Sequence, residues 1–510
     1  MSLSQFQQHI TQLITTAETM LGSPRSGKPE ENTKDGLIVP VLDALSYTSE
    51  YRTLEGVIRK AYLVATSVLE ITVLDPACGS GSFLLGAFDY LLTEIKRYNL
   101  ACQNAKIPAN FDLFSHVAPQ PIINPEEQIL VKMLHGVDRD PQAVLLAKLS
   151  LWTRLLRARP GEYGRRNGSI YSHLPALTLN IRVGDSLVHS PANLQPFATQ
   201  LAIVADLAKI ARDTTQTEIE RNQAVSNLET RITAINQEIN PVLTAFFASD
   251  ESINSVVNFI KNRDADDNEI EAIRKLIIQA TNSDQSLENW TPEELARVKS
   301  ELMTLSTAFE EVVIKKPFNW ELEFPHIFDP RLPKSARGFS AIIGNPPYFN
   351  VDATFGRGAL ELKWLKFAYS DIYTDKTDIL FYFFRRGFDI LQEDGYLSFI
   401  ISRSFIQGDK SRSLREFICK NTKIVNIIDF LGHQVFQAGI ATCIMQLQRK
   451  NPQPEDTFTT FYVLDLDVVK NTFNSDDDCL SLTHGITQVD ITQSQLNDHR
   501  WQISPYNHCK

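Results

Sequence analysis

The chain has 510 residues and a formal net charge of −11, with 43% hydrophobic and 22% charged residues. This composition excludes a disordered chain and a small basic nucleic-acid-binding module, and the length allows two or three folded domains. An enzyme acting on nucleic acid stays compatible with the charge, because only the surface that lines its substrate cleft must be basic.

The sequence carries no evident signal for a membrane or for export. No apolar run reaches the length of a membrane span, and residues 1–15 lack a basic segment followed by an apolar core. Six cysteines, scattered from Cys78 to Cys509, show neither paired spacing nor the spacing of zinc ligands. We therefore expect a cytoplasmic protein with no membrane contact, no disulfide framework and no metal site.

Residues 1–70 predict a helical N-terminal region. An amphipathic pattern runs from Phe6 to Leu21, and a second segment with helical character ends near Glu70. A metal-dependent nuclease needs a carboxylate pair and a lysine around a hard cation. No Pro-Asp followed by Asp/Glu-x-Lys precedes Val73, so we expect no DNA cleavage by this chain.

A glycine-rich turn follows the first predicted parallel strand. Val73–Asp75 predicts this strand, Ser82–Arg97 predicts the next helix, and the stretch that joins them reads Asp75-Pro-Ala-Cys-Gly-Ser-Gly-Ser-Phe83. Its glycines allow a tight turn and close backbone approach, with N–H groups at the helix start available to a ligand. Leu84 stands where a dinucleotide-binding fingerprint has its third glycine. The turn therefore predicts a site for a small polar ligand.

Acidic residues follow the next two predicted strands. Leu134–Asp138 ends in a carboxylate that is positioned to accept bonds from two ribose hydroxyls. Asp140 is the expected N-cap of a helix over Pro141–Leu156. Leu179–Ser186 predicts a third strand that ends in a Gly-Asp pair.

The stretch from residue 186 to residue 337 contains no glycine and is rich in Gln, Asn, Glu and Ala. Apolar residues recur at helical spacing, at Ile219, Val225, Leu228, Ile232, Ile235 and Ile239. This pattern predicts a long helical insertion over residues 191–317, with a hairpin break at Pro241.

A second loop, Asn345-Pro-Pro-Tyr348, follows the buried strand predicted for Phe339–Ile343. Two prolines fix the backbone and remove two N–H donors, so a nearby carbonyl is more easily left to accept a hydrogen bond. The loop suits a planar ring with an amino group, whose hydrogens would go to Asn345 Oδ1 and to a backbone carbonyl while the ring stacks on Tyr348. A plain Pro-Pro turn with a capping asparagine is the alternative.

The remaining chain alternates strands and helices. After Tyr348 a loop to Thr374 predicts a mobile flap, followed by helices at 378–391 and 411–420 and strands at 396–402 and 424–430. Gly432–Phe436 and Thr442–Gln448 predict an antiparallel edge hairpin. The fold class is therefore α/β, a doubly wound and mostly parallel sheet with this hairpin and the long helical insertion.

Two basic groups offer phosphate contacts, and solvated basic loops are the alternative for each. The first lies at the end of a predicted helix and just beyond it, and consists of Arg154, Arg157, Arg159, Arg165 and Arg166. The second consists of Lys410, Arg412 and Arg415.

The two loops together resemble the amino-group methyltransferases that use S-adenosylmethionine. The closest resemblance is to the N6-adenine DNA methyltransferases of type II restriction–modification systems, especially the fused type IIG enzymes. It runs from about Val73 to about Gln448, with a gap between Asp185 and Asn319. It implies a Rossmann-like methyltransferase fold, S-adenosylmethionine as cofactor, and double-stranded DNA with a flipped adenine as substrate.

The resemblance also assigns residues. It implies a cofactor site made of Asp75, Pro76, Ala77, Cys78, Gly79, Gly81, Phe83, Asp138 and Asp185, where Asp185 bonds the exocyclic amine of the cofactor's adenine. It implies a catalytic site made of Asn345, Pro346, Pro347, Tyr348 and Phe436, where Phe436 is a second aromatic that supports the extruded base. A core residue beneath a hairpin is the alternative for Phe436.

This sequence departs from the family pattern in places. It has no Tyr-Thr-Pro element between Tyr47 and Glu70, Ser340 replaces the usual aspartate of the catalytic strand, and the chain stops near Trp501, about where the family begins its target recognition domain. These departures imply a truncated type IIG-like chain, and they leave room for a separate specificity or nuclease subunit as partner.

We expect the following domains: a remnant of a nuclease-type region at 1–70, the cofactor-binding half at 71–190, the insertion at 191–317, the catalytic half at 318–450, and a C-terminal extension at 451–510 that starts the missing recognition domain. The expected function is site-specific adenine-N6 methylation of DNA in a restriction–modification or related defence system. A weakly active or inactive remnant, and a methyltransferase acting on RNA or on protein glutamine, are the alternatives.

Overall fold

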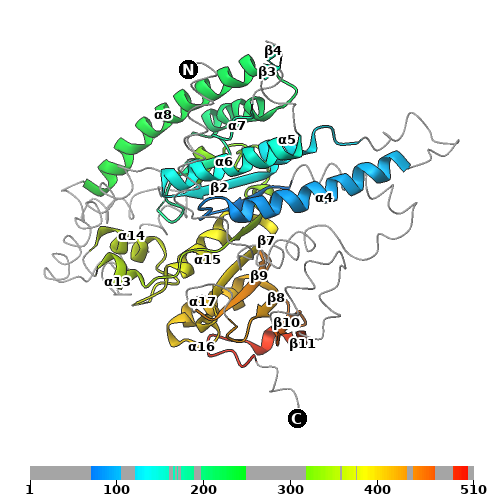
Figure 1. Cartoon of the computed structure of the whole chain (residues 1–510). Helices are drawn as coiled ribbons and strands as arrows, with labels where there is room; N and C mark the ends of the chain where they lie inside the picture. Colours follow the sequence, from blue (N-terminus) through cyan, green and yellow to red (C-terminus); the bar gives the residue numbers. More distant parts are fainter. Residues whose placement is uncertain are drawn as a thin grey trace.

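The computed structural model describes residues 71–104, 121–159, 165–166, 169–170, 174–188, 194, 197–248, 318–356, 359–374, 376–433, 440–465 and 486–503. The predictions for residues 1–70, for residues 249–317 of the insertion and for Phe436 lie outside this part of the chain. A mixed sheet runs through the described part, with helices packed on both of its faces (Figure 1).

The sheet consists, in spatial order, of β11 (Ile486–Thr492), β10 (Thr457–Val463), β8 (Lys423–Asp429), β9 (Thr442–Gln448), β7 (Leu391–Ser402), β6 (Phe339–Gly344), β1 (Val73–Asp75), β2 (Leu134–Asp138) and β5 (Ile181–Val183). Parallel pairing joins β5, β2, β1, β6 and β7 without interruption, so their carboxyl ends share one edge of the sheet. A separate small ladder joins β3 (Arg165–Arg166) to β4 (Ser169–Ile170).

The helices are α4 (Ser82–Asn104), α5 (Pro125–Gln128), α6 (Pro141–Ala158), α7 (Ala198–Arg212), α8 (Glu218–Ala248), α12 (Trp320–Glu323), α13 (Val351–Phe355), α14 (Leu360–Ala368), α15 (Ile379–Ile390), α16 (Ser404–Gln407) and α17 (Arg412–Asn421). A π-helical turn, Ile129–Met133, precedes β2, and 3₁₀ turns lie at Lys334–Ala336, Asp409–Ser411 and Gln493–Gln495. None of the described helices is long and apolar enough to cross a membrane.

The predicted fold class is confirmed: the sheet is mostly parallel and carries antiparallel strands toward one edge. β9 is antiparallel to its neighbours, as expected for Thr442–Gln448, but it lies between β7 and β8 instead of at the edge. The edge hairpin is β10–β11, which extends the sheet beyond β8. Residues 457–463 and 486–492 of the predicted C-terminal extension thus belong to the main sheet.

The central strands bury residues toward both faces. Leu74 of β1 and Ile342 of β6 lie in the core under α14, α15 and α17. Val73 and Ile343 lie in the core under α4 and α6. Successive side chains of a strand point to opposite faces, so a sheet covered by helices on both sides reads as a continuous apolar run. This explains why these strands were recognisable in the sequence.

The first two helices of the insertion form a hairpin beside β5 (Figure 1, green). Leu201 and Val204 of α7 pack against Leu228 and Ile232 of α8. The break predicted at Pro241 is wrong, because α8 continues through it to Ala248. A proline inside a helix costs about 3 kcal/mol, and the preceding turns of α8 are already held against α7.

The last residue of α7 fastens this hairpin to the sheet. Arg212 is 6% exposed, and its guanidinium contacts Nε2 of His135, at 3.0 Å, and Nε2 of His326. It also donates to the Lys132 carbonyl at 2.8 Å. Burial, and next the Arg212 charge, hold the pKa of both histidines well below the usual range, so both rings stay neutral and can accept.

The segment predicted as a mobile flap is instead a packed helical segment. Between Tyr348 and Thr374 lie α13 and α14, and Trp364 and Leu365 of α14 are at most 2% exposed. Tyr369 follows α14 and donates its hydroxyl to the Leu187 carbonyl at 2.7 Å. In the sequence, apolar and polar residues alternate here over too few residues to predict a helix.

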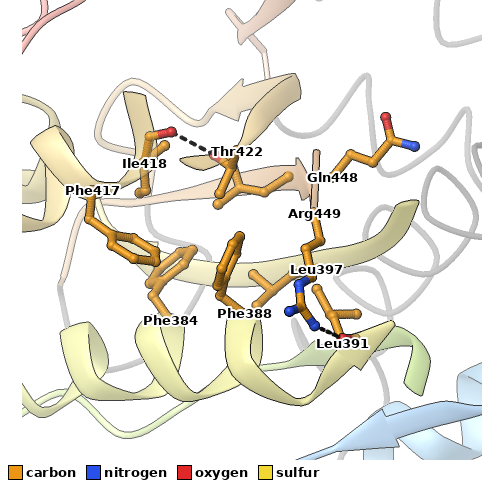
Figure 2. A pocket seen from close by; sticks show the side chains of 10 residues that line it. Phe384, Phe388, Leu391, Leu397, Phe417, Ile418, Thr422, Gln448 and Arg449 are labelled. Atoms are coloured by element: carbon orange, nitrogen blue, oxygen red, sulfur yellow. Dashed lines mark hydrogen bonds between the residues drawn. The ribbon is translucent and has the colours of Figure 1, made fainter. Parts of the chain in front are cut away.

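A small apolar gap lies where α15 and α17 meet over β7 and β9 (Figure 2). The rings of Phe388 and Phe417 stand edge to face with centroids 5.1 Å apart, and the Arg449 guanidinium lies 5.1 Å from the Phe388 centroid. The gap measures about 10 Å³, which is about the room that one water needs. It is a packing defect near the amino end of β7, remote from the strand ends where ligands bind in such sheets.

Replacing Arg212 tests the fastening of the insertion. Arg212→Met keeps the aliphatic length but leaves the two imidazoles and the Lys132 carbonyl without their donor, so we expect a loss of about 1–3 kcal/mol in the free energy of unfolding in urea. Arg231→Met, at an exposed position of α8, is the matched control and should change stability little. Equal stability of the two variants would contradict this role of Arg212.

Candidate functional site

The pairing of β1 with β6 brings the two sequence loops together. The strands are parallel, with Val73 opposite Ala341 and Leu74 opposite Ile342. Ser340, which replaces the family's aspartate, exchanges hydrogen bonds with Thr72, whose Oγ1 accepts from Ser340 N at 3.0 Å. The glycine turn after Asp75 and the loop at Asn345 therefore leave the sheet side by side, at the same edge.

Gly344 and Asp75 bring the two loops into close contact. A Cβ built on Gly344 would lie 2.8 Å from Asp75 Oδ1, which is too near for a methyl group. The φ of Gly344 is 159°. Only a residue without a side chain lets the Asn345–Tyr348 loop leave β6 against this carboxylate.

Asp75 is a buried carboxylate with an unused oxygen. It is 1% exposed, and its Oδ1 accepts from Ala77 N at 3.0 Å. Oδ2 is buried and has no hydrogen-bond partner among the described residues. Burial raises the pKa of Asp75 to about 7, and the nearby Asp138 charge adds to this rise. Such an acceptor calls for a ligand that carries a donor.

The glycine turn wraps onto β2. Cys78 N donates to the Val137 carbonyl at 3.0 Å, and Gly79 N donates to Asp138 Oδ2 at 2.9 Å. Gly81 has a φ of +86°, and a Cβ there would lie 3.1 Å from the Ala147 side chain on α6. The turn thus needs glycine both for its backbone angle and for its contact with α6. Burial raises the pKa of the Cys78 thiol, so this cysteine is not a thiolate nucleophile.

The end of β5 meets the same turn through a residue that the sequence did not single out. Ser186 donates its hydroxyl to the Pro76 carbonyl at 2.6 Å. Beside it, Asp185 Oδ1 accepts from Leu187 N at 3.0 Å, and Oδ2 pairs with Arg139 Nε at 3.2 Å. Arg139 comes directly after Asp138, so the two acidic positions are linked across the carboxyl ends of β2 and β5.

The structure therefore gathers the expected cofactor residues at one edge. Asp75 ends β1, Asp138 ends β2, Asp185 follows β5, and the others lie in the turn before α4 or in its first turn: Pro76, Ala77, Cys78, Gly79, Gly81 and Phe83. Asp138 Oδ1 also accepts from Asp140 N at 2.9 Å. The side chain of Asp140 caps α6 by accepting from Gln142 N at 2.9 Å, which confirms the predicted N-cap.

The Asn345–Tyr348 loop itself is partly open. Asn345 and Tyr348 are half-buried, Pro346 is buried and Pro347 is exposed. The Tyr348 hydroxyl contacts Asn345 Oδ1 and lies 2.9 Å from the Ile400 carbonyl of β7. Burial raises the pKa of Tyr348, so the hydroxyl stays protonated. The hydroxyl thus ties the loop to the neighbouring strand.

Backbone pairing holds the downstream end of the loop. Val351 N donates to the Thr377 carbonyl and Ile379 N donates to the Phe349 carbonyl, both at 3.0 Å. Asn350 and Asp378 form an antiparallel bridge between these bonds. The segment after Tyr348 is therefore fixed to the start of α15.

Phe436 lies outside the described residues, but the base of its segment is described. Arg403, which follows β7, donates to both oxygens of Asp429 at 2.8 and 3.0 Å. Asp429 is 1% exposed and also accepts from Leu431 N at 2.9 Å. This ion pair, whose carboxylate is buried, fixes the end of β8, after which the chain continues toward Phe436. Neither residue stood out in the sequence.

Three of the expected phosphate-binding arginines are engaged with other residues of the chain. Arg154 pairs with Asp89 at 2.6 Å, and Arg412 pairs with Asp498. Arg415 is 1% exposed and donates to backbone carbonyls. In the part of the chain that the structure describes, no group of three His, Cys, Asp or Glu residues could hold a metal ion.

Comparison with known proteins gives a consistent family. The model of the Eco57I restriction-modification methylase matches residues 132–436, more than half of the chain. The chain is 26% identical over 409 residues to the putative type II restriction enzyme and methyltransferase RM.MjaORFECS2P of Methanocaldococcus jannaschii, covering 76% of this chain and 30% of that protein. It is 32% identical over 165 residues to the type II restriction enzyme and methyltransferase RM.Eco57I of Escherichia coli, covering 31% of this chain and 16% of that protein. The chain thus spans less than a third of these relatives.

Solved structures of low identity also align. The alignment with the DrdV–DNA complex covers 94% of this chain and 31% of the other chain, with 13% identity and a TM-score of 0.41. The alignment with the ATP-dependent type ISP restriction-modification enzyme LlaBIII bound to DNA covers 87% of this chain and 20% of the other chain, with 12% identity and a TM-score of 0.39.

The raised pKa of Asp75 predicts a pH dependence of stability. The unfolded carboxyl ionises near its ordinary pKa of 3.8, whereas the folded one keeps its proton up to about 7. Folded stability therefore falls as the pH rises through this window. The free energy of unfolding of Asp75→Asn, relative to that of the wild type, should therefore increase by up to roughly 4 kcal/mol between pH 4 and pH 8. Urea unfolding without cofactor at several pH values measures this difference, and a constant difference would contradict the assignment.

Proposed function

Because the chain belongs to the Eco57I restriction-modification methylase family, we propose that it is a DNA methyltransferase that uses S-adenosylmethionine and methylates the N6 amino group of adenine. The observation that carries this proposal is the approach of Asp75 to Gly344, which joins the glycine turn and the Asn-Pro-Pro-Tyr loop at one sheet edge. Family membership confirms the resemblance that the two loops first indicated.

The residues at this edge fit the cofactor. The unpartnered Asp75 Oδ2 is a buried acceptor suited to a cationic amine. Asp138, at the end of the second strand, suits the ribose hydroxyls, and Asp185 suits the amine of the cofactor's adenine. Gly79 and Gly81 let a ligand approach the backbone at the start of α4. When bound, S-adenosylmethionine supplies an electrophilic methyl group.

Asn345 and Pro346 would prepare the acceptor. The lone pair of an adenine amine is delocalised into its ring, which makes the amine a poor nucleophile. Hydrogen bonds from its two hydrogens to Asn345 Oδ1 and the Pro346 carbonyl would favour tetrahedral nitrogen and localise the lone pair. These bonds are strongest when positive charge develops on nitrogen, so they lower the barrier more than they tighten binding.

The contact between Tyr348 and Asn345 bears on this role. A phenol has one hydrogen, so it cannot donate to Asn345 Oδ1 and to the Ile400 carbonyl together. Half a turn of the Asn345 amide would balance the network: Nδ2 would donate to the Tyr348 hydroxyl, which would donate to Ile400. Oδ1 would then be released for a substrate amine. Tyr348 would thus position Asn345 as well as offer a ring to the extruded base.

The DNA partner and the domain layout belong to the same proposal. A base inside a duplex cannot reach this edge, so the adenine must be extruded from double-stranded DNA. We retain the proposed halves at 71–190 and 318–450 on either side of an insertion at 191–317. A separate specificity or nuclease subunit remains a proposed partner of the chain.

Removing the Asn345 amide tests the chemistry. Asn345→Ala should lower the rate of methyl transfer by about 10²–10³-fold, as expected for a lost transition-state hydrogen bond. The Kd for S-adenosylmethionine, measured by calorimetry, should stay within about twofold, because the glycine turn is untouched. Asn227→Ala, on the exposed face of α8, is the matched control. A near-normal rate for Asn345→Ala would sink the mechanism.

The substrate class needs its own assay. The purified chain with methyl-tritiated S-adenosylmethionine should label genomic DNA lacking N6-methyladenine, and nucleoside chromatography should place the label on that base. RNA and a protein extract, offered separately, should stay unlabelled. Label on RNA or on glutamine would assign another substrate, and no label with any of the three would favour an inactive remnant.

A further inference from the structure

A pocket of about 270 Å³ with a mixed polar and apolar lining lies beside the proposed catalytic loop. One wall is the fixed segment after Tyr348, represented by Asn350 and Asp378. Another is the carboxyl end of β7, where Ser402 lies two residues after the carbonyl that receives the Tyr348 hydroxyl. The pocket therefore adjoins the place where the proposed mechanism holds the extruded adenine.

Two lysines stand at the rim of this pocket. Lys376 and Lys410 are both exposed, and neither forms an ion pair with a carboxylate of the described residues. The two segments that carry them touch, since Thr374 Oγ1 donates to the Lys410 carbonyl at 3.2 Å. Two cationic side chains thus share one opening.

The acidic groups of the lining are already engaged. Asp409 pairs with Arg500 at 3.0 Å. Asp378 caps α15 by accepting from Leu380 N at 3.0 Å, and burial raises its pKa, which weakens its negative charge. Of the four charged residues of the lining, the two aspartates are thus engaged, whereas the two lysines are not ion-paired among the described residues.

Hydroxyl groups line the wall between the lysines. Ser402 Oγ lies 2.8 Å from Ser404 Oγ, and Ser411 is also in the lining. Phe381 and Phe405 form an apolar floor, with ring centroids 6.4 Å apart. Hydroxyl donors, cations and an apolar floor together suit a sugar–phosphate unit, whose charge sits at one end and whose ring is weakly polar.

The loop that carries Lys410 is held from inside. The buried guanidinium of Arg415 donates to the carbonyls of Phe405 and Gly408 at 2.7 and 2.8 Å. Trp501 packs its ring against Phe405, with centroids 5.4 Å apart, and donates its backbone N–H to the Ile406 carbonyl at 3.0 Å. Lys410 is therefore presented by a fixed loop.

We propose that this pocket binds the sugar–phosphate backbone of the DNA strand next to the extruded adenine, with Lys376 and Lys410 as phosphate ligands. The inference rests on the proposed function. An extruded nucleotide stays joined to its neighbours, so the backbone must pass close to the rim of the base site. Phosphates in this position would be met by the only two cations of the pocket lining.

Binding of DNA at several salt concentrations tests the proposal. The probe is a fluorescent 30-base-pair duplex with a mismatched adenine, and the variant is Lys376→Gln with Lys410→Gln in the full chain. Its Kd at 100 mM salt should rise about tenfold, and the slope of log K against log salt should fall by about 2, since each phosphate contact contributes about 0.9. The variant with arginine at both positions should keep the wild-type slope.

The matched control is Lys96→Gln with Lys334→Gln. Lys96 is exposed far along α4, and Lys334 is exposed before β6, at the opposite end of the strands. This control should keep the slope and the affinity of the wild type. Affinity for S-adenosylmethionine should not change in any variant.

The outcomes separate the two proposals. A Lys376/Lys410 variant that binds the duplex like the Lys96/Lys334 control overturns the pocket assignment, while DNA methylation by the wild type would still stand. Wild-type protein that neither binds the duplex nor methylates DNA overturns both. Loss of binding with an unchanged salt slope also contradicts a phosphate contact.

Discussion

The close packing of the Asp75 carboxyl against Gly344 is the constraint on which the site depends. Parallel pairing of β1 and β6 would bring any two loops near each other. Here the contact is tighter, because a Cβ at position 344 would lie 2.8 Å from the carboxyl oxygen. The carboxyl is buried and lacks a partner for Oδ2 among the described residues. Such groups lower stability, and they are typical of sites where a ligand completes the structure.

The long separation between the two halves follows from the position of β5. This strand is at one edge of the sheet, whereas β6 is at its centre beside β1. The chain leaves at the edge, forms α7 and α8 outside, and returns through Phe318 to the centre. An insertion at this point leaves the sheet order intact. Arg212 contacts two neutral histidines, His135 on β2 and His326, and so ties the hairpin of α7 and α8 to the sheet.

Much of the fold was predictable because the sheet is covered on both faces. Short apolar stretches in β1 and β6, and the helix capped by Asp140 after β2, made those strands predictable. The place of β9 was not predictable, since a strand's own sequence does not say which neighbours it joins. The course of α8 through Pro241 depends on packing against α7. The buried roles of Arg212 and Arg415 were hidden too, because an arginine in sequence predicts a surface position.

The site shows a similar division. The glycine turn and Asn345-Pro-Pro-Tyr348 could be singled out in the sequence because both occur, in this order, whereas the second loop alone is equally typical of a Pro-Pro turn. Ser186, Arg139 and the Arg403–Asp429 pair are single residues whose role arises only when strands meet. The contact between Tyr348 and Asn345 belongs to this class as well, since it also needs the Ile400 carbonyl from a strand about 50 residues away.

The C-terminal residues connect the sheet to the helices α16 and α17. β10 and β11 extend the sheet past β8, and the chain then crosses to α16 and α17 (Figure 1). There Trp501 packs on Phe405, while Asp498 and Arg500 pair with Arg412 and Asp409. These contacts hold the loop between α16 and α17. Since that loop carries Lys410, the residues after the family match at 436 form part of the support of the proposed DNA-binding pocket.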